Sequence, residues 1–461
     1  ARVEVVDPDL AVLVSGATDG EGRFSLSVPD GGALLRVWAH AAPVGSPVLV
    51  TRDEDGESPH RVEVALADSS QPMEVVAADS GHDRPGGAFH LLDGMVTALL
   101  AATSWTGEGM PPLHAHWRPG ETTRWSYYRG EVPEGSGRYA FEILAGLASE
   151  QETTDTDEHD EAIVIHEVGH MVMDLTSTSS SIAGPHPPGT YVDPGLAWEE
   201  GRVTWFAAAV LGSPIYQDTV GLEPEGHLRV DLDLSRINDG PRGNGSERTV
   251  AEVLWQLSDG TDGLEDVDGD PISLGPEALL QTMMELREVP GAYPCLSSFL
   301  LHLVDSGRVD QASVTDMLEA TGQPPEVFPA AEDGTWPLDI EVPGEATGRI
   351  DGVTDPAPSG GPAHPSTAFD SVHAYRFELP QPGDVEVRLA IEGSGEEGDR
   401  TDLDLELRDI RARLVDEART SDRAEVLGPI PLEAGWYVVY VRDSGEGNLA
   451  SYRLTLLDGG D

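Results

Sequence analysis

Apolar and polar residues alternate with a period of two in the first and last parts of the chain, and follow helical spacing between them. In residues 1–67 the alternation recurs in short runs separated by Gly, Pro and Asp, which predicts strands joined by turns. The clearest runs are residues 23–28, 34–38 and 61–66. This segment is therefore predicted to be a small β-sandwich. Residues 68–87 are polar and rich in Gly, which is typical of a linker.

Apolar residues spaced three and four apart predict an α-rich domain over residues 88–340. The periodic segments are 90–103, 157–175, 196–211, 248–257 and 276–286. Residues 341–366 have the Gly, Pro, Ser and Ala content of a second linker.

A period of two returns in residues 367–461, where at least five segments predict strands: 375–379, 385–389, 403–407, 436–441 and 452–456. A second β-sandwich at this end is consistent with that pattern. The chain is therefore predicted to be a multidomain α+β protein, with a mostly α-helical domain flanked by two small all-β sandwiches.

Charge restricts the partners of this protein. Its 461 residues carry 83 acidic and 28 basic side chains, a formal net charge of −55, and every basic residue is Arg. Such a field repels a phosphate backbone, so we expect no nucleic-acid partner. The acidity would favour a cationic partner, but solubility or a saline habitat is the preferred explanation.

One cysteine, Cys295, excludes an internal disulfide, so stability has to come from packing or from bound metal. No apolar run reaches the ~18 residues of a membrane-spanning helix, so we expect no membrane span. The chain begins at Ala1 without Met, and we interpret it as a processed chain whose leader is absent. This predicts a secreted or cell-surface location. No feature of the sequence indicates an oligomeric state.

The sequence from His166 to His170 is an H-E-x-x-H motif inside a predicted helix. Two histidines at i and i+4 lie about 5–6 Å apart at Cβ and point the same way, so both imidazoles can reach one zinc ion. Glu167 is one step round the helix and can reach water at the metal without ligating it. A five-residue motif also arises by chance, on an exposed helix for example, so its context has to support it.

A catalytic zinc needs a third protein ligand and an open position for water. Residues 196–207 begin a second predicted helix and contain the adjacent acids Glu199 and Glu200. This segment resembles the second-helix motif of gluzincin metallopeptidases, in which a Glu before Gly ligates zinc and an aromatic residue follows five positions later. The resemblance implies Glu200 as the third ligand, because Gly201 follows it and Trp205 is the aromatic residue.

Glu199 is the competing ligand. Adjacent helical residues diverge by about 100°, so both acids cannot face one ion equally. We therefore expect Glu199 to interact with the helix dipole or to orient a neighbour. Many gluzincins place an Asp one turn after the ligand Glu to orient a zinc-bound histidine, and this chain has Thr204 there. A hydroxyl accepts an imidazole N–H less strongly than a carboxylate, so the chain departs from the family pattern at this position.

Other segments carry resemblances to known modules. Residues 111–120, 155–161 and 192–194 resemble a group of uncharacterised bacterial gluzincin-like peptidases, a likeness that spans about residues 87–290. Residues 16–29 resemble carboxypeptidase-regulatory-like domains. Residues 402–405 and 432–437 resemble motifs of the prepeptidase C-terminal (PPC) domain, which is common on secreted bacterial proteases. These resemblances imply a zincin-like catalytic domain between two accessory sandwiches, with a protein or peptide as substrate.

The implied reaction is hydrolysis of a peptide bond, in which zinc polarises the scissile carbonyl and its water, and Glu167 moves the proton. Gluzincins add a Tyr or His that stabilises the oxyanion, and Tyr191 and His227 are our candidates. The substrate backbone usually pairs with a strand ahead of the helix. Residues 125–128 and 139–144 are both candidates for that strand.

Residues 259–270 are dense in carboxylates and Gly, so Ca²⁺ is a second candidate metal. Their spacing does not match an EF-hand, and a solvated acidic turn is the favoured explanation of the composition.

Two other functions remain open besides a secreted zinc metalloendopeptidase. One is a non-catalytic, metal-bound adhesion or binding protein. The other is an aminopeptidase, which is less favoured because the chain lacks a Gly-x-Met-Glu-Asn segment.

Overall fold

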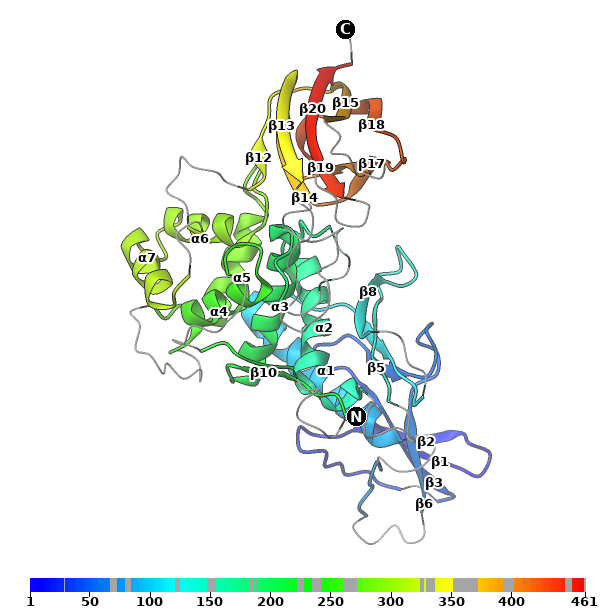
Figure 1. The fold of residues 1–461 in the computed structure, drawn as a ribbon. Coiled ribbons are helices and arrows are strands. Elements are labelled where there is room, and N and C mark those ends of the chain that lie inside the picture. The colour runs from blue at the N-terminus through cyan, green and yellow to red at the C-terminus, as the bar shows by residue number, and fades with distance from the viewer. Residues whose placement is uncertain are drawn as a thin grey trace. The chain divides into compact units, whose positions relative to one another are not determined.

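The structure is a computed structural model of the chain, and it describes residues 1–28, 30–66, 73–78, 84–120, 125–146, 155–182, 184, 186, 189–221, 228–233, 242–260, 272–323, 327–328, 336–350, 372–392, 402–443 and 450–459. Within these ranges the chain forms seven α-helices and five β-sheets, a mixed α+β architecture with more than one domain (Figure 1). The residues group into two compact units. Unit 1 comprises residues 1–175 and 206–231, and unit 2 comprises residues 176–205 and 232–461.

The first sheet of unit 1 is antiparallel, with strand order β2-β1-β3-β6. Its strands are β1 (Arg2–Val6), β2 (Val12–Ala17), β3 (Leu34–Trp38) and β6 (Arg61–Ala65). Val3, Val5, Leu35 and Val37 form the buried cluster of this sheet. Residues 23–28 were predicted to be a strand, and this prediction is wrong because they form no ladder. Their alternating apolar side chains nevertheless pack against the cluster, which explains the sequence pattern.

The second sheet of unit 1 is mixed, with order β4-β5-β7-β9-β8. Its strands are β4 (His40–Ala41), β5 (Val48–Thr51), β7 (Leu113–His116), β8 (Tyr127–Glu131) and β9 (Tyr139–Glu142). The inner pairs β5–β7 and β7–β9 are parallel, and the outer pairs are antiparallel. Segment 1–67 thus shares a sheet with strands that follow residue 88. The predicted domain boundaries stay a prediction.

Two helices of unit 1 precede the strand pair β10 (Ile215–Asp218) and β11 (Leu228–Asp231). Helix α1 (Pro85–Thr106) starts at a proline and ends at Gly107, whose positive φ of 70° suits a glycine. By length and composition α1 could cross a membrane, but half of its most apolar window is buried within the fold, as in core helices of globular proteins. The short 3₁₀ turn η1 (Asp157–His159) leads into α2 (Glu161–Thr176). Gly94 of α1 lets Val164 of α2 approach closely.

Unit 2 contains most of the remaining helices: α4 (Glu247–Ser258), α5 (Gly275–Leu286), α6 (Leu296–Asp305) and α7 (Gln311–Ala320). Helix α3 (Pro194–Leu211) contributes residues 194–205 to unit 2 and residues 206–211 to unit 1. The five predicted helical segments are confirmed, and α6 and α7 were not predicted. The side chains of Ser246 and Asp310 accept hydrogen bonds from the first turns of α4 and α7, which explains where those helices begin.

Two sheets at the end of the chain face each other across one buried cluster (Figure 1). The first, in order, contains β12 (Leu338–Asp339), β14 (Val372–Leu379), β19 (Gly435–Asp443), β16 (Leu403–Asp409) and β17 (Leu414–Ala418). The second contains β13 (Gly344–Ile350), β20 (Ala450–Asp458), β15 (Gly383–Glu392) and β18 (Ala424–Leu432). All five predicted strands are present. Strand β13 lies in the segment predicted to be a linker.

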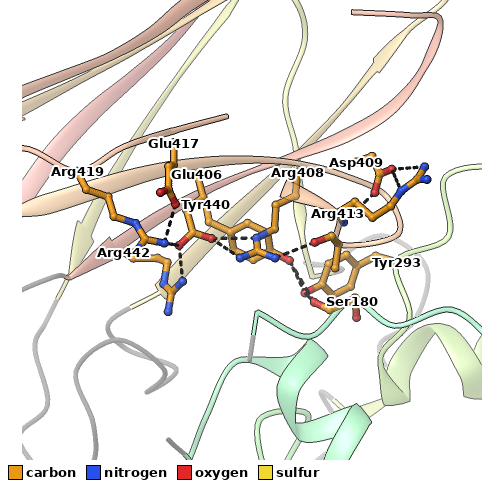
Figure 2. Close-up of polar contacts among 11 residues, drawn as sticks. Ser180, Tyr293, Glu406, Arg408, Asp409, Arg413, Glu417, Arg419, Tyr440 and Arg442 are labelled. Carbon is orange, nitrogen blue, oxygen red and sulfur yellow. Dashed lines mark hydrogen bonds and ion pairs between the residues drawn. The ribbon is translucent and has the colours of Figure 1, made fainter. Parts of the chain in front are cut away.

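Charged groups pair on the face of the first of these sheets that is turned away from the shared buried cluster, because Glu406 alternates with the inward-facing Leu405 and Leu407 of β16 (Figure 2). Glu406 is buried and contacts the guanidinium groups of Arg408, Arg419 and Arg442. Burial alone would raise the pKa of Glu406, but Arg442 and Arg408 lower it overall. Three arginines of this acidic chain thus compensate one buried carboxylate.

Candidate metal centre

Helix α2 carries the H-E-x-x-H motif, and burial explains its orientation. Val164, Ile165, Val168, Met171 and Val172 on this helix are fully buried, whereas His166 and His170 are half-buried. One face of α2 therefore packs in the hydrophobic core, and another carries the two imidazoles. The two imidazole centroids lie 4.9 Å apart. Glu167 is 6% exposed, so a carboxyl group lies in a largely desolvated position beside the histidines.

The ligand atoms of His166, His170 and Glu200 all lie within 4.8 Å of one another. Glu200 lies in α3, and its side chain is buried. Two imidazoles and one carboxylate make up the donor set of His₂Glu zinc sites. The residues present therefore fit a metal ion, by both their chemistry and their proximity.

Two tyrosines of unit 1 contact the histidines. The hydroxyl of Tyr216, in β10, lies 3.3 Å from Nδ1 of His166, which leaves Nε2 of that ring for a metal. Tyr128, in β8, stacks on His170 with a centroid distance of 6.2 Å and an interplanar angle of 11°, and its hydroxyl donates to Asp174. Both rings restrict the imidazoles to one orientation. The local sequence around Tyr216 contains no motif, so only the fold identifies this residue.

Glu199, the competing ligand, has a different partner. Its carboxylate pairs with the guanidinium of Arg202, which is completely buried and also donates to the Ser177 hydroxyl at 2.7 Å. Glu199 thus contacts a neighbouring residue of α3, and its predicted role in orienting a neighbour stays a prediction. A carboxylate that compensates a buried arginine is poorly placed to serve a metal as well.

His186 contacts the ligand carboxylate within unit 2. Its Nε2 lies 3.6 Å from Oε1 of Glu200, and its Nδ1 lies 3.1 Å from Oε1 of Glu247 at the start of α4. The imidazole thus lies between two carboxylates and can orient that of Glu200. No spacing in the sequence relates His186 to either acid.

Asp193 determines where α3 begins. Its Oδ1 accepts hydrogen bonds from the backbone N–H groups of Gly195 and Leu196, and Pro194 occupies the first helical position. Asp193 is completely buried, and this burial raises its pKa to about 6. The Tyr293 hydroxyl lies near Asp193 and exchanges a hydrogen bond of 2.8 Å with the Tyr440 hydroxyl of the β-sandwich (Figure 2).

The other predicted site residues have the following positions. Tyr191 is half-buried and its ring lies against Gly245, and Thr204 is half-buried on α3. His227 lies outside the described residues, as do residues 261–270 of the predicted Ca²⁺ loop. The roles proposed for Tyr191, His227 and Thr204 stay predictions.

A second group that could hold a metal consists of carboxylates alone. The ligand atoms of Asp155, Asp157, Asp160 and Asp218 lie within 4.8 Å of one another, all in unit 1. The structure thus contains both a His/Glu group and an all-carboxylate group with the chemistry to bind cations.

Comparisons with known proteins give no further information on this candidate metal centre. No family model and no curated protein matches the chain. Among solved structures, the chain shows a weak likeness to the pre-peptidase C-terminal domain of a Bacillus anthracis collagenase, with 12% identity, a TM-score of 0.20, and coverage of 26% of this chain and 92% of that one.

Two further likenesses are weaker still. The periplasmic inhibitor of g-type lysozyme PliG from Aeromonas hydrophila has 12% identity and a TM-score of 0.16, over 26% of this chain and 96% of that one. A β-glucosidase from Paenibacillus barengoltzii has 11% identity and a TM-score of 0.13, over 98% of this chain and 59% of that one. At such low TM-scores, none of the three supports a functional argument.

Proposed function

We propose that the chain is a zinc-dependent metalloendopeptidase, with His166, His170 and Glu200 as ligands and Glu167 as general base. One observation carries the proposal: the three donor side chains lie within 4.8 Å of one another, and Glu167 adjoins His166 on α2. A helix that carried two histidines by chance would have no reason to bring a distant carboxylate to them.

Zinc bound by these residues would supply Lewis acidity, which polarises a carbonyl group and lowers the pKa of water. Glu167 supplies the proton transfer: its carboxylate accepts a proton from the attacking water and later returns it to the leaving nitrogen. Its low exposure strengthens electrostatic interactions at this position, because bulk water screens them less.

The peptide substrate would pair with β8. In its sheet β8 has one neighbour, β9, so its other edge is available for main-chain hydrogen bonds among the described strands. Strand β9 is paired on both sides, which favours residues 125–128 over residues 139–144. Trp125 and Tyr127 expose 63% and 46% of their surface beside this edge. Because Tyr128 stacks on His170, a strand added along β8 would pass close to the histidines.

Edge pairing also favours an endopeptidase over an aminopeptidase. It recognises extended main chain and requires no terminal amine. Secretion, and the assignment of the outer sheets to accessory modules, are parts of the proposal that depend on the sequence alone.

Cleavage of a peptide library, read by mass spectrometry, tests the proposal. The samples are the zinc-loaded chain, the chelated chain, Glu167→Gln, and Glu161→Gln as a matched control. Glu161 lies in the first turn of the same helix with an exposed side chain. We expect loss of the general base to lower cleavage by at least about 100-fold.

The control variant should cleave like the native chain, and chelation should abolish activity until zinc is restored. Equal activity in all four samples would remove the proposed mechanism. No activity in any sample would favour the alternative of a metal-bound binding protein.

A further inference from the structure

Four aspartates of unit 1 form a cluster just ahead of α2. Asp155 precedes η1, Asp157 lies in it, and Asp160 adjoins the first residue of α2. Asp218 is the last residue of β10. Two segments more than fifty positions apart thus contribute carboxylates to one small volume, with ligand atoms within 4.8 Å of one another.

Asp157 differs from a surface acid because its carboxylate is buried. Its side chain is 5% exposed, and its Oδ2 accepts a hydrogen bond from the Ser126 hydroxyl. Its Oδ1 is also buried, and among the described residues no donor reaches it. The same holds for Oδ1 of Asp155. Buried carboxylate oxygens without donors are costly, so this volume requires either a proton or a cation.

Neighbouring contacts hold the cluster in place. Asp155 forms an isolated β-bridge with Val220. The backbone N–H and the hydroxyl of Thr219 donate to the carboxylate of Asp160, at 2.8 Å and 2.9 Å. These bonds join the segment before α2 to the end of β10 independently of any ion. The carboxylate of Asp160 is therefore preorganised, and a carboxylate oxygen that accepts one hydrogen bond can still bind a cation.

From this geometry we infer that Asp155, Asp157, Asp160 and Asp218 form a Ca²⁺ site, separate from the His166 centre. The donors are all carboxylate oxygens, which hard cations prefer, and no imidazole or thiol that would favour zinc belongs to the group. Ca²⁺ accepts about six to eight oxygens in flexible geometry, whereas Mg²⁺ demands a near-ideal octahedron and keeps its waters. A site with four protein carboxylates therefore favours Ca²⁺.

The position of the site gives the ion a structural role. It would fix the start of α2 to the end of β10, and β10 carries Tyr216 two residues before Asp218. Since Tyr216 contacts His166, the ion would hold this tyrosine in register with the histidine. In the absence of a cation, burial and the neighbouring Asp155 raise the pKa of Asp157, so the competing state is a protonated carboxyl.

Calorimetric titration of the metal-free full-length chain with CaCl₂, at high NaCl concentration to screen non-specific binding, tests this inference. The native chain should bind one more equivalent of Ca²⁺ than Asp157→Asn. Asp316→Asn, which removes the same charge from an exposed position on α7, should bind like the native chain. His166→Ala should also retain the Ca²⁺ equivalent, which separates this site from the proposed zinc centre.

Hydrogen exchange of the native chain gives a second readout that needs no variant. Ca²⁺, but not Mg²⁺ at the same concentration, should slow exchange in residues 155–160 and 215–220. Equal Ca²⁺ stoichiometry in the native chain and Asp157→Asn would overturn the inference, and so would unchanged exchange in both segments. Either result would mean that a protonated carboxyl pair fills this volume.

Discussion

Glu199 and Glu200 are adjacent acids with different surroundings. Glu200 joins His166 and His170, whereas Glu199 pairs with the buried Arg202. The helical rotation of about 100° between neighbours separates the two roles.

This separation predicts opposite effects of two conservative substitutions. Glu200→Gln should weaken zinc binding by more than the about 10–100-fold that loss of an outer-shell partner costs, because a ligand itself is lost. Glu199→Gln should leave zinc stoichiometry unchanged but lower the free energy of unfolding by roughly 3–5 kcal/mol, since Arg202 then keeps a buried charge without its carboxylate. Zinc titration and urea unfolding measure the two effects. If Glu199→Gln weakened zinc binding and Glu200→Gln lowered only the free energy of unfolding, Glu199 would be the ligand in place of Glu200.

Tyr216 gives a second prediction at this scale. Tyr216→Phe removes the hydroxyl 3.3 Å from Nδ1 of His166 and should lower zinc affinity by about tenfold, because the ring loses its orienting partner. Competition with a chromophoric chelator measures the change. Tyr127→Phe, an exposed neighbour in β8, is the control and should bind zinc normally. Equal affinity of all three proteins would mean that Tyr216 does not orient His166.

The site residues that could be predicted lie in segments with a recognisable sequence pattern, and the others do not. His166, Glu167 and His170 follow from helical spacing, and Glu200 follows from its family-like setting before Gly201. Tyr216 and His186 reach the centre from segments whose local sequence contains no relevant signal. Their positions depend on strand pairing and loop paths, which hydrophobic periodicity does not encode.

At the scale of elements, the start of α3 depends on a buried acid. Asp193 caps the helix, yet its burial raises its pKa from about 4 in an unfolded chain to about 6. A raised acid pKa means that the folded state binds the proton more tightly. The protonated carboxyl of Asp193 therefore contributes to the free energy of unfolding below pH 4, and this contribution is lost as the pH rises through about 6.

Asp193→Asn should remove this dependence while keeping the cap, because an Asn oxygen accepts the same backbone bonds. Relative to the native chain, the variant should gain about 2–3 kcal/mol of unfolding free energy between pH 4 and pH 7. Urea unfolding at several pH values measures the difference. A difference that does not vary with pH would show that folding does not raise the pKa of Asp193.

The sequence patterns predicted most of the helices and strands named in advance but missed others. The segments predicted from apolar residues three and four apart became α1 to α5, and the five C-terminal alternating segments became strands. Residues 23–28 alternate equally well but only pack against a sheet, because alternation reports burial and not backbone pairing. Strand β13 was not predicted because three of its four more buried positions are Gly or Ala, which give little apolar signal in the sequence.

At the scale of the whole molecule, charge opposes compaction. A net charge of −55 on 461 residues means strong self-repulsion, which burial of Glu406 among arginines relieves only locally. Salt screens such repulsion, with a Debye length that falls from about 10 Å at 0.1 M to about 3 Å at 1 M.

The melting temperature of the metal-loaded chain should therefore rise as NaCl is increased over this range. KCl at equal ionic strength should have the same effect, because screening does not depend on the identity of the cation. A melting temperature that is constant or falls with salt would contradict the expectation that repulsion limits stability.

The sequence does not predict which strands share a sheet. Two alternating regions around a helical region do form sheets and helices, but β5 of the first region pairs with β7, which lies after residue 88, and β4 pairs with β5. Short strands join whichever edge completes their hydrogen bonds, and the sequence of one segment does not specify that edge.

The central claim is that two imidazoles from α2 and one carboxylate from α3 hold a single zinc ion. X-ray absorption spectroscopy at the zinc edge tests it most directly, on the full-length chain loaded with one equivalent of zinc. We predict a first shell of nitrogen and oxygen at about 2.0–2.1 Å with the signature of two imidazoles. In His166→Ala one imidazole should be lost. A shell without imidazole, or a spectrum identical in the native chain and His166→Ala, would contradict the account.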